Sequence, residues 1–205
     1  MSHRPRQRRK DARPHEILAA ALLEFEEKGF AHSTLASIAK RASISRTTIY
    51  LYYETKEAIL EAAIRNSVER TIDEVARMVR VHDADFSTLF ANAIDIIYDQ
   101  LVQGESAIFL KILVAEGQTM PDLVSFYRHQ ILSKGEAVIA ALIERGIANG
   151  ELSESCRAED VRIFMAPVIF AGLWTRVFGK IDPLDITAFK DAHVRLVTDA
   201  LMARS

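Results

Sequence analysis

The sequence is poor in the residues that support covalent and metal chemistry. It contains one cysteine, Cys156, among 205 residues, so no disulfide can form within one chain, and a lone thiol suits a reducing compartment. No Cys and His residues have the spacing of a zinc site, and no Glu-x-x-His pair indicates a di-iron bundle. The sequence therefore predicts no metal site and no cofactor.

Glycine is also scarce, which excludes a second group of sites. The eight glycines are scattered singly along the chain, so there is no glycine-rich loop of the kind that cradles phosphates. No Ser, His and Asp set stands out that the sequence alone could assemble into a nucleophilic triad. We therefore do not expect an enzyme.

Long apolar runs are absent as well. The longest, residues 163–174, has 12 residues, whereas a membrane-spanning helix needs about 20. The N-terminus is basic, without the apolar stretch of a signal peptide behind it. The composition, 49% hydrophobic and 26% charged, is typical of a globular protein. We expect a cytoplasmic protein with no membrane partner.

Charge is distributed unevenly along the chain. Residues 1–60 carry 11 Lys and Arg against 7 Asp and Glu, whereas residues 61–205 carry 15 against 21. Residues 1–13 alone contain six basic side chains and one acidic one. These thirteen residues are either a solubilising tail or an arm that follows DNA phosphates. A basic head on an acidic body favours nucleic-acid binding.

The most informative stretch is residues 33–60, STLASIAKRASISRTTIYLYYETKEAIL. Its first part predicts a short helix that begins after Ser33 or Thr34, either of which can serve as the N-cap. The apolar residues of this helix recur at i, i+3, i+4 and i+7 and therefore share one face. They are Leu35, Ile38, Ala39 and Ala42.

A second short helix follows a turn at residues 42–44. Ser45 is placed to cap it, and its exposed face is polar and aromatic. Thr55 then caps a third helix that opens with Lys56 and Glu57. This is the pattern of a helix-turn-helix, in which the second helix enters the DNA major groove.

The segment IAKRASISRTTIYLYYETKEAIL (residues 38–60) resembles the DNA-reading segment of TetR/AcrR-type transcriptional regulators. One difference is the turn, where that family usually has Gly and this chain has Ser43. Because Gly adopts a positive φ at little cost and Ser does not, we expect local strain there. The positions typical of the family are held by Ile38, Ala39, Ser45, Tyr50, Tyr52, Tyr53 and Lys56.

The resemblance implies an all-α fold of about nine helices. It also implies an N-terminal three-helix helix-turn-helix domain that binds DNA and a larger C-terminal helical domain that binds a ligand and forms a dimer. We place a basic flexible arm at residues 1–13, the DNA-binding domain at 14–55 and the effector-binding and dimerisation domain at 56–205. Pro14 suits the first turn of the first helix of the DNA-binding domain.

The resemblance and the residue types together predict a set of DNA-binding side chains. Arg46 begins the reading helix, where it can pair bidentately with a guanine. Tyr52 stands where relatives often have His. Hydroxyls and helix N-termini can hold phosphates. The predicted DNA-binding residues are Ser33, Thr34, Ser45, Arg46, Thr47, Thr48, Tyr50, Tyr52 and Lys56.

Helical periodicity continues to the end of the chain. A helix over residues 56–80 is long enough, at about 1.5 Å per residue, to link the head to the body. The piece AEGQTMPDLVSFYRHQIL (115–132) resembles a stretch common in the ligand-binding half of the same family. The remaining predicted helices cover residues 86–101, 107–115, 121–147, 159–178 and 186–203.

Aromatic residues of the body can line an apolar effector pocket with a few polar groups. Each of them can equally be an ordinary core residue. The candidate pocket residues are Phe90, Tyr98, Phe109, Phe126, Tyr127, His129, Phe164 and Trp174.

The last two predicted helices are rich in apolar residues, which must be buried within the chain or against another chain. In proteins that resemble this one, they form a four-helix dimer interface. The candidate interface residues are Val168, Gly172, Phe189, Val194, Val197 and Leu201.

The sequence thus predicts a homodimeric transcriptional regulator, most simply a repressor on a palindromic operator that a small apolar or amphipathic effector releases. Two alternatives remain open. The body can answer to a protein partner or to no effector, or the chain can be a helical interaction module with a non-functional head. The sequence does not name the operator, the effector or the regulated genes.

Overall fold

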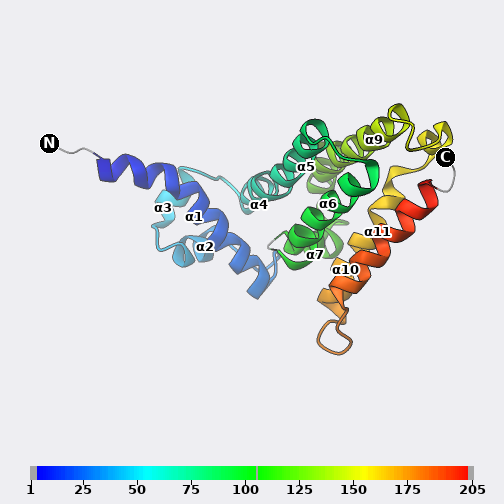
Figure 1. The fold of residues 1–205 in the computed structure, drawn as a ribbon. Coiled ribbons are helices and arrows are strands. Elements are labelled where there is room, and N and C mark those ends of the chain that lie inside the picture. The colour runs from blue at the N-terminus through cyan, green and yellow to red at the C-terminus, as the bar shows by residue number, and fades with distance from the viewer. Residues whose placement is uncertain (1–3, 105, 203–205) are drawn as a thin grey trace.

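The structure is a computed structural model that describes residues 4–104 and 106–202, with side chains from residue 13 onward. Every regular element in these ranges is a helix, which confirms the all-α prediction (Figure 1). None of the described helices is long and apolar enough to cross a bilayer.

The N-terminal head consists of α1 (Arg4–Lys28), α2 (Leu35–Arg41), α3 (Arg46–Tyr50) and the start of α4 (Lys56–Ile64). Helix α1 ends where Gly29 takes a φ of 79°, a left-handed conformation that favours glycine. Helices α2 and α4 both pack on α1, and α3 packs on α2. The head is therefore built on α1.

Helix α1 begins earlier than the sequence indicated. It starts at Arg4 and includes Pro14, so residues 4–13 are not the irregular arm that was expected, and residues 1–3 lie outside the described range. Arg, Gln, Lys and Ala in this stretch are favourable helix formers. Pro5 stands in the first turn, where its missing N–H has no helical partner to lose. The first turns of α1 extend away from the rest of the head (Figure 1).

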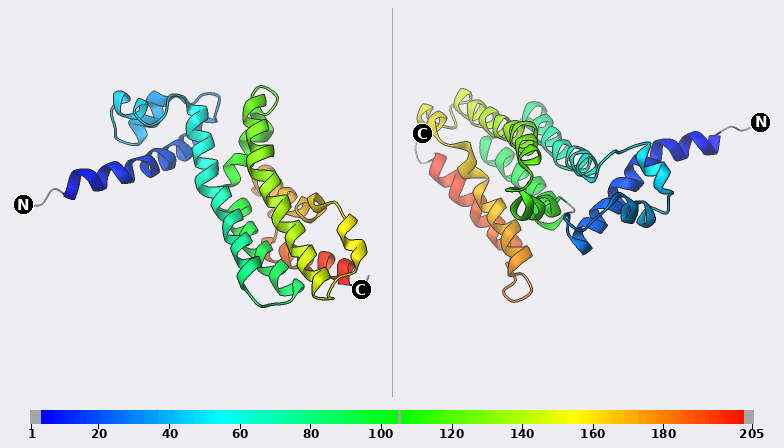
Figure 2. Two further views of the ribbon diagram at one scale, coloured as in Figure 1. Left: turned by 90° about the horizontal axis from the view of Figure 1, so that it is seen from above. Right: turned by 180° about the vertical axis from the view of Figure 1, so that it is seen from behind.

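The connecting helix is interrupted, although the sequence predicted one continuous helix over 56–80. Between α4 and α5 (Arg70–Val81) lies a π-helical stretch, η1 (Arg65–Glu69). Figure 2 shows the three segments in line from the head to the far end of the body. Such a π-helical stretch adds a residue to the helical repeat and is often found near functional sites.

The body contains the remaining helices, two of which, α10 and α11, lie side by side along one edge (Figures 1 and 2). Two further π-helical stretches and two 3₁₀ turns occur among them. In chain order these elements are α6 (Phe86–Tyr98), η2 (Asp99–Gln103), α7 (Ala107–Glu116), α8 (Pro121–Phe126), η3 (Tyr127–Leu132), α9 (Ser133–Ala148), η4 (Glu154–Ala158), η5 (Val161–Phe164), α10 (Ala166–Val177) and α11 (Ile186–Met202).

Two apolar clusters hold the chain together, and their boundary does not follow the predicted domain boundary at residue 56. One cluster lies among α5, α6, α9, α10 and α11. The other combines residues of α1 to α4 with Ile108, Phe109 and Ile112 of α7, and with Leu123 and Ile131 further on. The apolar core of the head therefore continues into the body.

Candidate nucleic-acid interface

Side-chain caps fix where the helices α2, α3 and α4 begin. Thr34 caps α2, because the Ser37 amide donates to its Oγ1 at 3.1 Å and the Thr34 amide donates to Ser37 Oγ at 3.1 Å. Ser45 caps α3 through the Thr48 amide at 3.0 Å, and Thr55 caps α4 in the same way. The predicted caps at Ser45 and Thr55 are confirmed. Of the two residues that the sequence offered as the cap of α2, Thr34 is the cap and Ser33 is not.

The turn between α2 and α3 is strained as expected. Ser43 has a φ of 53°, and it is the one non-glycine residue with positive φ in the described part of the chain. The turn closes through the Ile44 amide, which donates to the Ala39 carbonyl at 3.0 Å. The backbone path that a glycine would allow is therefore kept by a serine.

The exposed surface of α3 carries the candidate base-reading side chains. Arg46 and Thr47 are exposed, and Tyr50 is half exposed, whereas Ile49 is fully buried and anchors the helix. Leu51 follows at 79% exposure, and sequence reasoning did not single it out. The available signal was its position directly after the reading helix, where an apolar side chain can contact a thymine methyl group.

Other predicted residues lie at the edges of this surface. Thr34 and Ser45 are exposed, and Thr48 is half-buried with its hydroxyl 2.7 Å from Ser45 Oγ. Tyr52 and Tyr53 are half-buried and pack on the core of the head, and burial raises the pKa of Tyr53.

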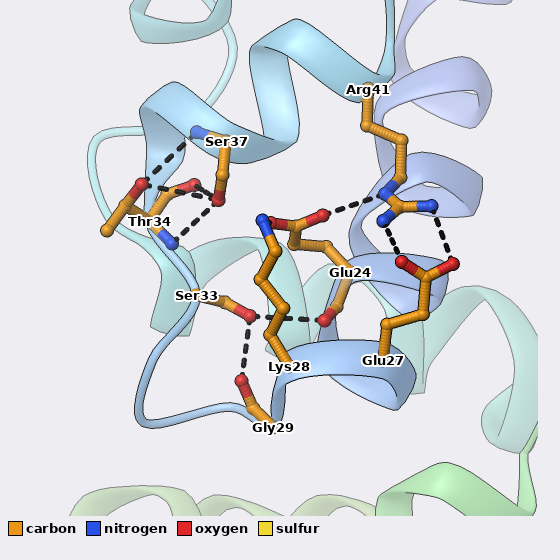
Figure 3. A network of polar contacts seen from close by, with 8 residues as sticks. All are labelled: Glu24, Glu27, Lys28, Gly29, Ser33, Thr34, Ser37 and Arg41. Atoms are coloured by element: carbon orange, nitrogen blue, oxygen red, sulfur yellow. Dashed lines mark hydrogen bonds and ion pairs between the residues drawn. The ribbon is translucent and has the colours of Figure 1, made fainter.

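Ser33 does not belong to this surface. Its side chain is buried, and its hydroxyl donates to the backbone carbonyls of Gly29 at 2.8 Å and Glu24 at 3.3 Å (Figure 3). The residue holds the α1–α2 loop against α1, so its hydroxyl is not available to a phosphate. The structure therefore gives no support to a contact between the Ser33 hydroxyl and DNA, which stays an untested prediction.

Lys56 has a structural attachment that the sequence did not indicate. Its Nζ donates to the carbonyls of Phe30 at 2.8 Å and Ala31 at 3.0 Å, and it lies 4.5 Å from the centre of the Phe30 ring. These contacts tie the start of α4 to the α1–α2 loop. An ammonium group has three protons, so one remains for a phosphate.

A charged network joins α2 to α1 (Figure 3). The Arg41 guanidinium donates through Nε to Glu24 at 2.8 Å and through Nη1 to Glu27 at 3.1 Å, and Lys28 pairs with the other Glu24 oxygen. Glu24 is 1% exposed, and its hydrogen bond to Lys28, with Ser37 and Arg41 helping, lowers its pKa to about 2. A glutamate is rarely buried in this way. The signal to the contrary was that Glu24 continues the stripe of Ile17 and Ala21.

The eight candidate pocket residues do not gather at one place. Phe90, Tyr98 and Phe164 belong to the body cluster, whereas Phe109, Phe126 and Tyr127 belong to the cluster shared with the head. Two others lie away from both clusters. They are His129, which is exposed and bonded to the Ser125 carbonyl, and Trp174, whose Nε1 donates to the Asp182 carbonyl at 2.9 Å.

Half of the candidate interface residues are also taken up inside the chain. Val168 and Leu201 belong to the body core, and Gly172 is buried where an added Cβ would meet Leu110 at 3.4 Å. They have no surface to offer a second chain. Phe189, Val194 and Val197 are partly buried.

Phe189 also belongs to a set of apolar side chains along α10 and α11 that sequence reasoning did not group together. The rings of Phe189, Phe170, Trp174 and Phe178 follow one another at centre-to-centre distances of 5.8, 5.4 and 4.8 Å. Val177 and Leu196 add exposed aliphatic surface at 63% and 73% exposure. We call these six residues the aromatic row, because its rings form one continuous apolar surface.

Residues 17–63, which span the head from α1 to α4, match the family model described as "Bacterial regulatory proteins, tetR family". The chain belongs to the TetR family. A curated relative, the HTH-type transcriptional regulator YdeS of Bacillus subtilis (strain 168), is 28% identical over 203 residues, which cover 96% of this chain and 98% of YdeS. The relatives of this TetR-family chain are transcriptional regulators, in agreement with the prediction that it is not an enzyme.

Solved structures share the fold over nearly the whole chain. The regulator FadR from Bacillus subtilis, in complex with stearoyl-CoA, has a TM-score of 0.74 at 22% identity and covers 91% of this chain and 98% of its own. A putative transcriptional regulator from Saccharomonospora viridis, in complex with choline, has a TM-score of 0.78 at 18% identity, with coverage of 95% and 100%. At these identities the likeness establishes the fold alone.

Proposed function

We propose that this TetR-family regulator is a repressor that binds a palindromic operator as a homodimer and leaves it when a small molecule binds the body. The observation that carries the proposal is the exposed face of α3, with Arg46, Thr47 and Tyr50 held outward by the buried Ile49. We place its action in the cytoplasm, where bacterial DNA lies.

Base reading falls to the start of α3 in this proposal. Arg46 pairs with a guanine through two hydrogen bonds, a contact worth about 1–3 kcal/mol of discrimination. Thr47 and Tyr50 read neighbouring positions, and Thr34, Ser45, Thr48 and Tyr52 contact phosphates and set the register. Lys56 contributes its one remaining N–H while it holds the α1–α2 loop.

The dimer is supported by the aromatic row on α10 and α11. A row of exposed rings on a helix pair is costly in water and gains from burial at about 25 cal/mol per Å². A two-fold axis through this face would present two copies of α3 to one DNA duplex. The two copies of α3 then read the two half-sites of a palindrome, which lie about 34 Å apart.

Response to a ligand is supported by the connection between head and body. The rod formed by α4, η1 and α5 joins the two, so a change in the body can alter the spacing of the two heads. A ligand achieves this only if it binds the two states with different affinities. Two proteins of the same fold are in complex with stearoyl-CoA and with choline, which shows that this fold accommodates ligands of differing chemistry.

Selection from a pool of random duplex DNA at moderate salt tests the proposal. We expect the purified protein to retain one palindromic motif. An Arg46→Ala variant should bind that motif about 10-fold more weakly or worse, the loss expected for one bidentate base contact. Lys111→Ala is the matched control, because Lys111 is exposed on α7 in the body.

Either of two results would contradict the proposal. Retention that depends on salt but not on sequence would make the head a charge patch, and the chain a helical interaction module. A motif bound equally well by the Arg46→Ala variant and by the control would remove Arg46 from the reading surface.

A further inference from the structure

A histidine that the sequence did not indicate lies inside the body core. His193, on α11, is 3% exposed. The Phe90 ring meets it edge-on at a centre-to-centre distance of 5.9 Å, and the Tyr98 ring lies at the same distance. The Tyr98 hydroxyl is 3.3 Å from its Nδ1. His193 and Tyr98 therefore form an isolated polar pair within an apolar cluster.

This pair is incompletely hydrogen-bonded. Among the described residues, the buried Nε2 atom of His193 has no hydrogen-bond partner. Burial lowers the pKa of His193, and an interaction with the Phe164 backbone opposes this. Burial also raises the pKa of Tyr98 to about 12, so both groups are neutral. A buried polar atom without a partner is unfavourable, and natural cores contain few of them.

A narrow void lies in the same apolar cluster as Tyr98. Its total empty volume is 160 Å³, and no part of it is wide enough for a water molecule. Phe90 lines the void and contacts His193, and Val197 lines it one helical turn after His193 on α11. Its walls are apolar throughout. They are formed by Phe86, Phe90, Ile139, Leu142, Ile143, Phe164, Val197 and Leu201.

We propose that this void is the closed form of a ligand site, and that it takes a neutral apolar molecule with one hydroxyl group, which bonds to Nε2 of His193. The inference rests on the proposed response of the body to a ligand, and it names the ligand class and the polar anchor. It does not depend on how the head reads DNA.

The hydroxyl group follows from the two tautomers of the pair. If Tyr98 donates to Nδ1, then Nε2 carries the proton and needs an acceptor; if Nδ1 donates to Tyr98, then Nε2 needs a donor. A hydroxyl group satisfies either state because it can donate and accept. A charged group would be buried among apolar walls without a counter-charge, which is strongly unfavourable. The site therefore selects against carboxylates and quaternary amines.

Opening of the site would be felt at the proposed dimer surface. The void is closed in this structure, so a ligand must separate its walls and stabilise a conformation that is rarely populated without it. One wall is α11, which carries His193 and Val197 on its inner side and Leu196 and Phe189 on the aromatic row. A displacement of α11 by the ligand therefore reaches the surface between the two chains.

The test uses the full-length protein with 1-octanol, octanoate and octyltrimethylammonium as probes. We expect saturable binding of 1-octanol alone, seen by calorimetry. Imidazole ¹⁵N spectra of the unmodified protein should show the Nε2 signal of His193 moving on addition of 1-octanol. This measurement needs no variant, so it remains informative even if substitutions in the core prevent folding.

A variant separates a ligand anchor from a structural histidine. His193→Leu should bind 1-octanol about tenfold more weakly, the change expected for one lost neutral hydrogen bond. Its free energy of unfolding should change little, because the unpaired Nε2 atom is removed while the Tyr98 hydroxyl loses its partner. His129→Leu is the control, since His129 is exposed on η3 away from the void, and it should leave binding unchanged.

Several outcomes would overturn the inference. They are an absence of 1-octanol binding, equal binding of octanoate, and a His193→Leu variant that is destabilised while it binds 1-octanol as well as the unmodified protein. Operator release is measured separately. If 1-octanol binds at His193 without releasing DNA, the site stands and the proposed ligand response fails; if Arg46→Ala has no effect on DNA, the reading surface fails and the site is untouched.

Discussion

Glu24 is the residue whose surroundings differ most from what its type suggests. A carboxylate at 1% exposure is stable there because Lys28 and Arg41 bind both of its oxygens. The contact between Glu24 and Arg41 joins α1 to α2, so it fixes the position of α2, which leads into the turn before α3. Removing one partner of such a buried pair leaves the other charge uncompensated.

The pKa of Glu24 makes the stability of the head depend on pH. Its folded value of about 2 lies below the ordinary value of 4.5, so its contribution is complete above pH 4.5 and is lost as the pH falls towards 2. The shift corresponds to a contribution on the order of 3 kcal/mol at neutral pH. Urea unfolding between pH 7 and pH 2.5 should show this loss, and Glu24→Gln should abolish most of it.

Glu27→Gln is the comparison for this experiment, because Glu27 bonds the same guanidinium from the exposed side of α1. It should change the acid profile little. Equal pH dependence in the Glu24→Gln variant and the unmodified protein would show that Lys28 and Arg41 do not stabilise the ionised carboxylate.

Ser43 offers a test of backbone strain at the reading turn. Its φ of 53° costs a non-glycine residue roughly 1–2 kcal/mol, whereas glycine loses about 0.5–1 kcal/mol through the greater conformational freedom of the unfolded chain. Ser43→Gly should therefore raise the free energy of unfolding by up to about 1 kcal/mol. Ala42→Gly, at a neighbouring φ of −74°, should lower it, and denaturant unfolding of both variants decides the matter. Destabilisation by both substitutions would remove the strain argument.

At the scale of helices, the sequence predicted well those elements whose ends carry a local signal. The starts of α3 and α4 follow from the hydroxyl caps at Ser45 and Thr55, which act over three residues. The π-helical stretch η1 has no such signal, because residues 65–69 keep ordinary helical periodicity; in the fold η1 lies against η3, a contact that the local sequence does not indicate. The early start of α1 was missed because Pro14 was interpreted as a residue of the first helical turn.

The candidate sites show the same limit. Exposed residues of the head, such as Arg46 and Thr47, could be placed from the motif because a short helix has one free face. The pocket could not be located, because residues with the same aromatic character belong to two separate clusters. His193 was not predicted because its partner Tyr98 lies 95 residues earlier in the chain, and the sequence alone does not show that the two side chains meet.

The aromatic row on α10 and α11 gives the element-scale prediction. If a second chain covers this row, a charge placed within it must be buried in the dimer at high cost. Leu196→Glu should raise the dimer dissociation constant by at least about tenfold, measured by sedimentation equilibrium. Val114→Glu is matched in exposure at 66% on α7 and should not. A monomeric unmodified protein, or equal effects of both variants, would refute the proposed interface.

For the whole molecule, the apolar cluster shared by the head and α7 predicts one cooperative unit. Phe109, at 1% exposure, lies in this cluster together with Ile38 and Ile49 of the reading helices. Calorimetry should give a single unfolding transition whose calorimetric and van't Hoff enthalpies agree. Phe109→Ala should lower stability by about 3–5 kcal/mol without splitting the transition. Two separate transitions would show that head and body are independent.

Leu132→Ala provides the control for this substitution. Its side chain is 41% exposed on η3, so the loss of stability should be small. A comparable loss of stability in both variants would show that the effect of Phe109→Ala does not come from the shared core.

The same cluster sets the order of events during synthesis. The residues of the head up to Ile64 leave the ribosome long before Ile108, Phe109 and Ile112, and before Ile131, which complete their apolar core. At roughly 5–20 residues per second, the nascent head waits on the order of seconds with part of its interior open to water. A nascent chain halted before residue 107 should therefore be a better substrate for chaperones than one halted after residue 131.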